Sequence, residues 1–239
     1  MTGNFNLEKG AVSAKTLITL TLIALAGIGI TVTGIIFEQQ VLRMIPLYVS
    51  LVVGALQSRA SRYASLIGGV NCLIYTAVYF SFGLYAMAFE TLLLSFPLQI
   101  ATFIRWNRNK YKNSTRFKSL SVRQIIIFGA VAVVAFAVLY ALLSVAGSSY
   151  RFIDILITLI ATAVLLLTLL AYREYTWLML MSGAANIYLD ITMMQDYPEQ
   201  ITYLIFSCYS FICIVMQFFS VRALLKEQED TSAVRTCKG

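Results

Sequence analysis

The chain has 239 residues, of which 59% are apolar and only 12% are charged, and its formal net charge is +7. A soluble domain carries about 25% charged residues. Apolar runs of about 18 residues or more recur along the chain, which is typical of several membrane helices. Membrane β-strands would instead alternate polar and apolar residues. The composition therefore predicts an all-α integral membrane protein.

The chain offers few groups for catalysis or metal binding. It contains no histidine, the commonest general base and metal ligand. Its four cysteines lie in or beside apolar segments without CxxC spacing, which favours packing or a free tail thiol over a metal site or a disulfide. No Walker motif for a nucleotide is present. We expect no cofactor and no metal.

Apolar runs between polar breaks predict eight membrane helices. The first run could pass for a signal peptide with a cleavage site after Ala26. It is longer than the ~7–15 apolar residues of a signal sequence, so it is interpreted as a helix. In chain order the predicted helices span 16–37, 44–58, 63–83, 85–104, 124–147, 152–172, 175–194 and 200–221.

Lysine and arginine predict the topology, because they concentrate in cytoplasmic loops. With the N-terminus inside, only Arg43 and Arg151 fall on the outer side. An even number of helices then places both termini in the cytoplasm. The clustering of basic residues at helix ends argues against a nucleic-acid partner. The most basic loop, 106–123, is interpreted as a solvated topology anchor, with binding of anionic lipid or a nucleotide as the alternative.

The predicted helices form two triplets, two to four and six to eight, on either side of helix five. Each triplet starts outside and ends inside, which predicts two parallel three-helix repeats joined by a linker helix. The expected divisions are 1–42 for the N-terminal tail and extra helix, 43–104 for the first repeat, 105–150 for the basic loop and linker helix, 151–222 for the second repeat and 223–239 for a cytoplasmic tail.

A short motif recurs in the middle helix of each repeat. GGVNCLIY at 68–75 and GAANIYLD at 183–190 share the pattern Gly-x-x-Asn. The glycines would let neighbouring helices approach closely, and Asn71 and Asn186 would then point into the bundle. Each amide could bind a ligand or form an interhelical hydrogen bond, and the sequence leaves both interpretations open.

Acidic residues within apolar segments are candidates for a functional site. A charge at the centre of a membrane costs at least ~2.5–3.5 kcal/mol, so it usually faces a cavity or a partner. Glu90 and Asp190 lie within predicted helices, and Asp190 shares a helix face with Asn186. Asp154 lies one turn from Arg151, so a structural ion pair is its simpler explanation.

Polar and aromatic side chains at helical spacing predict a cavity. Pro97 permits a kink in the fourth helix. Trp106 and Trp177 fall near the expected membrane interfaces, where an aromatic belt is the ordinary explanation. The cavity would suit a small ligand with a hydrogen-bonding polyol and a flat ring, including a cationic one. Its further candidate residues are Tyr75, Tyr79, Gln99, Thr102, Trp106, Tyr203, Ser207, Ser210 and Gln217.

From about residue 46 to residue 222 the chain resembles the PnuC family of bacterial vitamin transporters. The resemblance is carried by SRYASLIGGVNCLIYTAVYFSFGLYA, by ETLLLSFPLQIATFIRWNRN and, less closely, by RFIDILITLIATAVLLLTLLAYREYTWLML. It implies a SWEET-like three-plus-one-plus-three fold in the bacterial inner membrane. It also implies facilitated diffusion of nicotinamide riboside, which a cytoplasmic kinase then traps by phosphorylation.

The resemblance implies that Asn71 and Asn186 contact the ligand and that Gln99 and Trp106 belong to a signature of the first repeat. Members that take nicotinamide riboside usually carry Trp-x-x-Trp at the start of the seventh helix, followed four residues later by Asn. Here Leu180 replaces the second tryptophan, and Asn186 follows six residues later. The expected substrate-binding residues are Asn71, Tyr75, Glu90, Gln99, Trp106, Trp177, Asn186 and Asp190.

Several alternatives follow from the same residues. Relatives move thiamine or are associated with riboflavin or deoxynucleosides, so these are alternative substrates. The substrate-binding subunit of an energy-coupled importer is a second class, which would need a docking face for an ATPase. An enzyme is not expected, since paired acids and metal-ligand clusters are absent from the sequence. Expected partners are a vitamin or nucleoside substrate, membrane lipids, the trapping kinase and further copies in a homo-oligomer.

Overall fold

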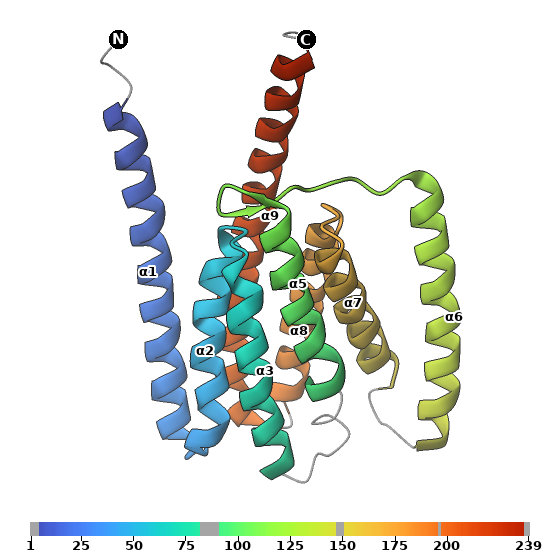
Figure 1. Cartoon of the computed structure of the whole chain (residues 1–239). Coiled ribbons are helices and arrows are strands. Elements are labelled where there is room, and N and C mark those ends of the chain that lie inside the picture. The colour runs from blue at the N-terminus through green and yellow to red at the C-terminus, as the bar shows by residue number, and fades with distance from the viewer. Residues whose placement is uncertain (1–4, 82–90, 147–150, 196, 237–239) are drawn as a thin grey trace.

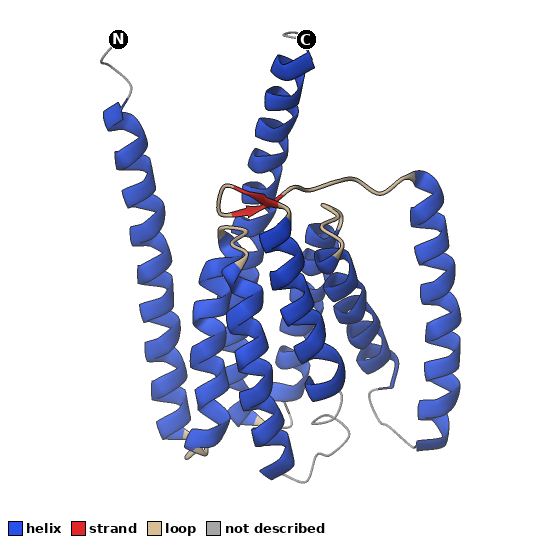
Figure 2. Ribbon diagram, viewed as in Figure 1, coloured by secondary structure: helices blue, strands red, loops and turns tan. Residues whose placement is uncertain are grey.

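The computed structural model describes residues 5–81, 91–146, 151–195 and 197–236. Nearly all of this part of the chain is helical (Figure 2), in agreement with the predicted all-α fold. The short π-helix η1 (Thr91–Ser95) leads into α5, and the 3₁₀ turn η2 (Pro198–Gln200) leads into α9. The α-helices are α1 (Phe5–Ile36), α2 (Val41–Ser58), α3 (Tyr63–Ser81), α5 (Phe96–Arg108), α6 (Val122–Ala146), α7 (Arg151–Leu169), α8 (Tyr175–Met194) and α9 (Ile201–Thr236).

Helix ends differ from the prediction where polar residues continue a helix. The first helix begins at Phe5 instead of residue 16, and α9 continues to Thr236 instead of ending at 221. Apolar runs mark only the lipid-buried part of a helix, whereas Lys, Glu and Gln are good helix formers that extend it into water. Most of the expected C-terminal tail is therefore helical. Glu90, at the start of the predicted fourth helix, lies outside the described residues.

The helix type changes beside Pro97, where the sequence permits a kink. Pro97 is the second residue of α5, and Phe96 separates it from the π-helical turn η1. Proline has no backbone N–H, so the regular hydrogen bond to the residue four positions earlier cannot form there. A local π-helical turn is one of the adjustments that accommodate proline in membrane helices.

Six helices form a closed ring (Figure 1). Around the ring, α2 packs on α3, α3 on α5, α5 on α7, α7 on α8, α8 on α9 and α9 on α2. The first helix of each repeat therefore packs against the last helix of the other repeat. Because both contacts between the repeats are of the same kind, the two repeats occupy equivalent positions in the ring, as expected for parallel repeats around an axis along the membrane normal.

The remaining two helices lie outside the ring. Helix α1 packs against α2 and α9, and α6 stands at the edge of the bundle against α7 (Figure 1). Large apolar side chains on both helices are exposed, as expected where lipid surrounds a protein. Within the described residues, segments of α1, α2 and α9 are each long and apolar enough to cross a membrane.

Both termini lie at the same end of the bundle as the β-hairpin of the basic loop (Figure 1). We call this the basic end. The shared side agrees with an even number of membrane crossings. That the basic end faces the cytoplasm stays a prediction from the distribution of lysine and arginine.

The basic loop folds over the basic end instead of forming only a solvated anchor. Strand β1 (Lys110–Tyr111) pairs antiparallel with β2 (Ser114–Thr115). Phe117 then inserts between helices and is only 8% exposed. Its ring packs edge-on against Trp106 at 5.5 Å and stacks on Tyr175 at 6.2 Å, measured between ring centroids.

Hydrogen bonds attach this loop to the second repeat. The backbone N–H of Lys118 donates to the carbonyl of Ala171 (3.0 Å), and that of Arg173 donates to the carbonyl of Lys118 (2.9 Å). The side-chain amide of Gln228 on α9 accepts from the N–H of Phe117 (3.2 Å) and donates to the carbonyl of Thr115 (3.1 Å). The loop thus holds α5 of the first repeat to the turn between α7 and α8 and to α9.

Candidate functional site: a polar cavity inside the ring

A cavity of about 490 Å³ lies inside the ring and is lined by residues of all six ring helices. Its volume falls within the roughly 300–1,000 Å³ of small-molecule pockets. Of the expected substrate-binding residues, the structure brings Tyr75 and Gln99 of the first repeat together with Asn186 and Asp190 of the second in this cavity. The further candidates Tyr203, Ser207 and Ser210 on α9 also line it. The cavity therefore lies between the repeats, where transporters of this kind hold their substrates.

The second repeat supplies the acid and a free amide. The hydroxyl of Ser207 on α9 donates to a carboxylate oxygen of Asp190 (2.5 Å). Asp190 forms no ion pair with any described residue. Asn186, one turn earlier on α8, lines the cavity, and its side chain makes no hydrogen bond to another described residue. A half-buried carboxylate and an amide are thus available to a ligand.

The equivalent asparagine of the first repeat has a different environment. Asn71 is 6% exposed and does not line the cavity. Its side-chain nitrogen donates to the hydroxyl of Ser50 (2.8 Å) and to the carbonyl of Pro46 (3.3 Å), both on α2. Its side-chain oxygen is buried and accepts no hydrogen bond from any residue that the structure describes. In this conformation Asn71 joins two helices, and its role as a ligand contact stays a prediction.

The glycines of both motifs allow close helix packing, as predicted. A Cβ atom added at Gly68 would lie 3.4 Å from the side chain of Gln99 on α5. One added at Gly183 would lie 2.8 Å from the ring of Phe211 on α9. In each repeat the missing side chain lets the third helix approach the middle helix closely.

A second cavity of about 50 Å³ lies on the basic side of the first and shares Gln99 with it. Gln99, Thr102 and Trp106, which recur at helical spacing along α5, all line this smaller space. Gln217 donates to the hydroxyl of Tyr175 there (2.9 Å). Beyond it lies the buried cluster of Trp106, Phe117 and Tyr175. The polar interior therefore narrows and ends at an aromatic barrier at the basic end.

The two tryptophans lie apart from the main cavity. Trp106 is 3% exposed, and its indole N–H donates to the carbonyl of Thr168 (2.8 Å), so it is buried in the bundle and not part of an aromatic belt. Trp177 is 54% exposed and packs edge-on against Phe218. As substrate contacts, both stay predictions, as does Glu90. The side chains of Arg151 and Asp154, and that of Tyr79, also lie outside the described residues.

Two polar residues that line the cavity were missed by the sequence analysis. Ser182 lies four residues before Asn186, and Ser95 lies four residues before Gln99. Residues four apart share a helix face, so this spacing could have identified both. The partnership of Asp190 with Ser207 joins two different helices, and no local spacing in the sequence indicates it.

A helical bundle whose two parallel repeats enclose a polar cavity is the architecture of a membrane transporter. The sequence profile of the nicotinamide mononucleotide transporter family matches residues 40–219, and the chain belongs to this family. It is thus a member of a transporter family and not an enzyme. The matched range leaves out α1 and the C-terminal extension of α9, which agrees with the position of α1 outside the ring.

A solved structure shows the same fold. The crystal structure of the vitamin B3 transporter PnuC aligns with a TM-score of 0.72, over 89% of this chain and 92% of that chain. The sequences are 19% identical, so this similarity establishes the fold alone. Among curated proteins, no sequence matches the chain significantly.

Proposed function

We propose that the chain carries a nucleoside-like vitamin across the membrane by facilitated diffusion, with nicotinamide riboside as the first candidate. The proposal rests on the central cavity, which combines Asn186 and Asp190 with Tyr75 and Gln99. Amide groups can donate to and accept from ribose hydroxyls. The carboxylate of Asp190 would compensate a cationic nicotinamide ring, and the face of Tyr75 would attract the same cation.

The charges around the cavity favour a ligand without a phosphate. The family takes its description from nicotinamide mononucleotide, which carries a phosphate group. None of the described lining residues is lysine or arginine, and Asp190 is acidic. A phosphate there would remain unpaired beside a like charge, which costs binding energy. The riboside, without the phosphate, matches this lining better.

Thiamine is the second candidate, because it also carries a cationic ring that Asp190 could compensate. Where the resemblance implies a second tryptophan this chain has Leu180, so one aromatic side chain of the pattern for nicotinamide riboside is absent. Riboflavin and deoxynucleosides are neutral, and Asp190 gives them no electrostatic advantage. The charge of the ligand therefore divides the candidate substrates into two groups.

Transport by alternating access would involve the aromatic barrier. Trp106, Phe117 and Tyr175 are buried and close the basic end in this conformation. Passage to that side requires these rings to separate, and the basic loop would move with Phe117. If the basic end is cytoplasmic, phosphorylation of the released nucleoside by a kinase would trap it there and maintain the inward gradient. The transporter itself would then need no energy source.

The test is a ligand panel measured on purified protein in detergent. Nicotinamide riboside, nicotinamide mononucleotide, thiamine, riboflavin, pyridoxine and several deoxynucleosides are scored by thermal shift and then by calorimetry, because a ligand that binds only the folded state raises the Tm. We expect nicotinamide riboside to stabilise the wild type. Asp190→Asn should weaken cationic ligands roughly tenfold while changing neutral ones little, since charge-assisted contacts are about twice as strong as neutral ones.

The matched control is Glu199→Gln, which removes the same charge from an exposed residue outside the cavity. It should leave every affinity unchanged. Equal losses for cationic and neutral ligands in Asp190→Asn would contradict the electrostatic role. Stabilisation by nicotinamide mononucleotide but not by the riboside would contradict the proposed substrate.

A further inference from the structure

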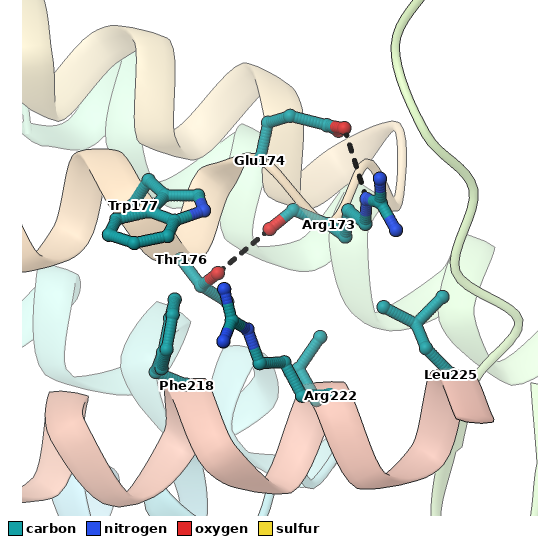
Figure 3. A pocket seen from close by; sticks show the side chains of 8 residues that line it. Arg173, Glu174, Thr176, Trp177, Phe218, Arg222 and Leu225 are labelled. Atoms are coloured by element: carbon teal, nitrogen blue, oxygen red, sulfur yellow. Dashed lines mark hydrogen bonds and ion pairs between the residues drawn. The ribbon is translucent and has the colours of Figure 1, made fainter. Parts of the chain in front are cut away.

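Trp177 lies in a pocket at the basic end, on the outside of the ring. The pocket has a volume of about 320 Å³ and is formed by the start of α8 and by α9 (Figure 3). Arg173, Glu174 and Trp177 border it from one side, and Phe218 and Arg222 border it from the other. It is separate from the central cavity, since none of the described residues lines both spaces.

Arg222 supplies the unbalanced charge of this pocket. Its guanidinium carbon lies 4.2 Å from the ring centroid of Phe218 and 5.4 Å from that of Trp177. No described residue forms an ion pair or a hydrogen bond with it, so its N–H donors are open. Arg173 pairs with Glu174 at 3.3 Å, and their two charges largely cancel. The pocket as a whole therefore carries one surplus positive charge on an arginine held in place by aromatic rings.

An apolar groove continues from this pocket along the bundle. The groove has a volume of about 560 Å³ and lies between α6, α7 and the start of α8. Glu174 and Trp177 border both spaces, so the groove and the pocket meet at these residues. Among the described residues that line the groove, Glu174 is the only charged one. Gly129 on α6 opens into it, because a Cβ atom added there would meet no described atom within 4 Å.

We propose that this surface binds one anionic phospholipid from the leaflet at the basic end. The phosphate lies on the guanidinium of Arg222, whose planar fork can donate two parallel hydrogen bonds to it. An acyl chain fills the groove and places α6 against the ring, since α6 otherwise packs mainly against α7. Trp177 lies where the pocket and the groove meet, and tryptophan is enriched at the level of the lipid headgroups. Basic pockets between membrane helices are known sites for acidic headgroups.

Native mass spectrometry of the full chain tests the site. The protein is purified in mild detergent and titrated with phosphatidylglycerol, phosphatidylcholine and diacylglycerol that carry the same acyl chains. The wild type should retain one phosphatidylglycerol and bind it more tightly than the other two. Arg222→Gln should weaken phosphatidylglycerol about fivefold, the effect of one basic side chain at an anionic headgroup. Gly129→Leu should weaken all three lipids by filling the groove.

Two further variants keep the result interpretable. Arg108→Gln removes an exposed arginine at the same end of the bundle and should leave lipid binding unchanged. Arg222→Lys retains the charge and should keep most of the preference for phosphatidylglycerol, which covers the case in which Arg222→Gln does not fold. If Arg222→Gln and Arg108→Gln lose the same affinity for phosphatidylglycerol, diffuse surface charge explains the binding and the proposed site is overturned. The site would also be overturned if the wild-type protein retained no lipid and instead formed an oligomer in which a second copy of the chain covers the groove.

Discussion

In α3 of the first repeat, Asn71 is buried and hydrogen-bonded to Ser50 on α2, whereas in α8 of the second repeat Asn186 lines the central cavity. The two residues hold the same place in Gly-x-x-Asn motifs and in a ring with equivalent positions for both halves. One turn further along, Tyr75 in the first repeat corresponds to Asp190 in the second, and both line the cavity. Equivalence in sequence therefore fixes the place of a side chain in the fold, but not its partner.

The largest expected difference is in ligand affinity, between variants of the two asparagines. Asn186→Leu should weaken the stabilising ligand about 10- to 100-fold, because the ligand loses a hydrogen bond and its own polar group is left unpaired. Asn71→Leu should change affinity less than about threefold and lower the stability by about 1 kcal/mol, the usual size of an interhelical hydrogen bond in a membrane. Calorimetry and thermal unfolding separate the two effects. Equal loss of binding in both variants would show that Asn71 also reaches the ligand.

The paired glycines should differ in stability. Gly183→Ala places a methyl group 2.8 Å from the ring of Phe211 and 3.1 Å from Ile214, so we expect a loss of about 1–3 kcal/mol from overpacking. Gly68→Ala meets only the side chain of Gln99 at 3.4 Å, which can move. It should therefore cost less stability while displacing a residue of the cavity, which weakens the ligand. A larger loss of stability in Gly68→Ala would contradict this order.

The smallest expected effect concerns the loop that joins the repeats at the basic end. Gln228→Ala removes two hydrogen bonds to the loop, each contributing about 0.5–1.5 kcal/mol. Amide hydrogen exchange over residues 110–118 should become several-fold faster. The control Glu227→Gln removes only the exposed ion pair with Lys112, which contributes about 0–1 kcal/mol. Unchanged exchange in Gln228→Ala would mean that Phe117 alone holds the loop in place.

Helix boundaries were predictable where charged or polar residues border an apolar run. The predicted helix 175–194 coincides with α8, which follows Arg173 and Glu174 and ends before Gln195. The same reasoning failed for α9, because the polar residues after 221 favour a helix as strongly as the apolar ones before them. Glycine packing and the polar face of α5 were also predictable, since both depend on spacing along one helix.

By itself, the sequence determined the all-α membrane fold, the two repeats and seven of the residues that line the cavity, because hydrophobic length and helical period are local properties of the chain. The tertiary structure decided what each inward face meets. It placed Asn71 against α2 and Asn186 in the cavity, and it brought Ser207 to Asp190. It also inserted Phe117 at the basic end and left Trp177 beside Arg222 on the outer surface. These outcomes depend on how six helices close into a ring, which brings together residues far apart along the chain.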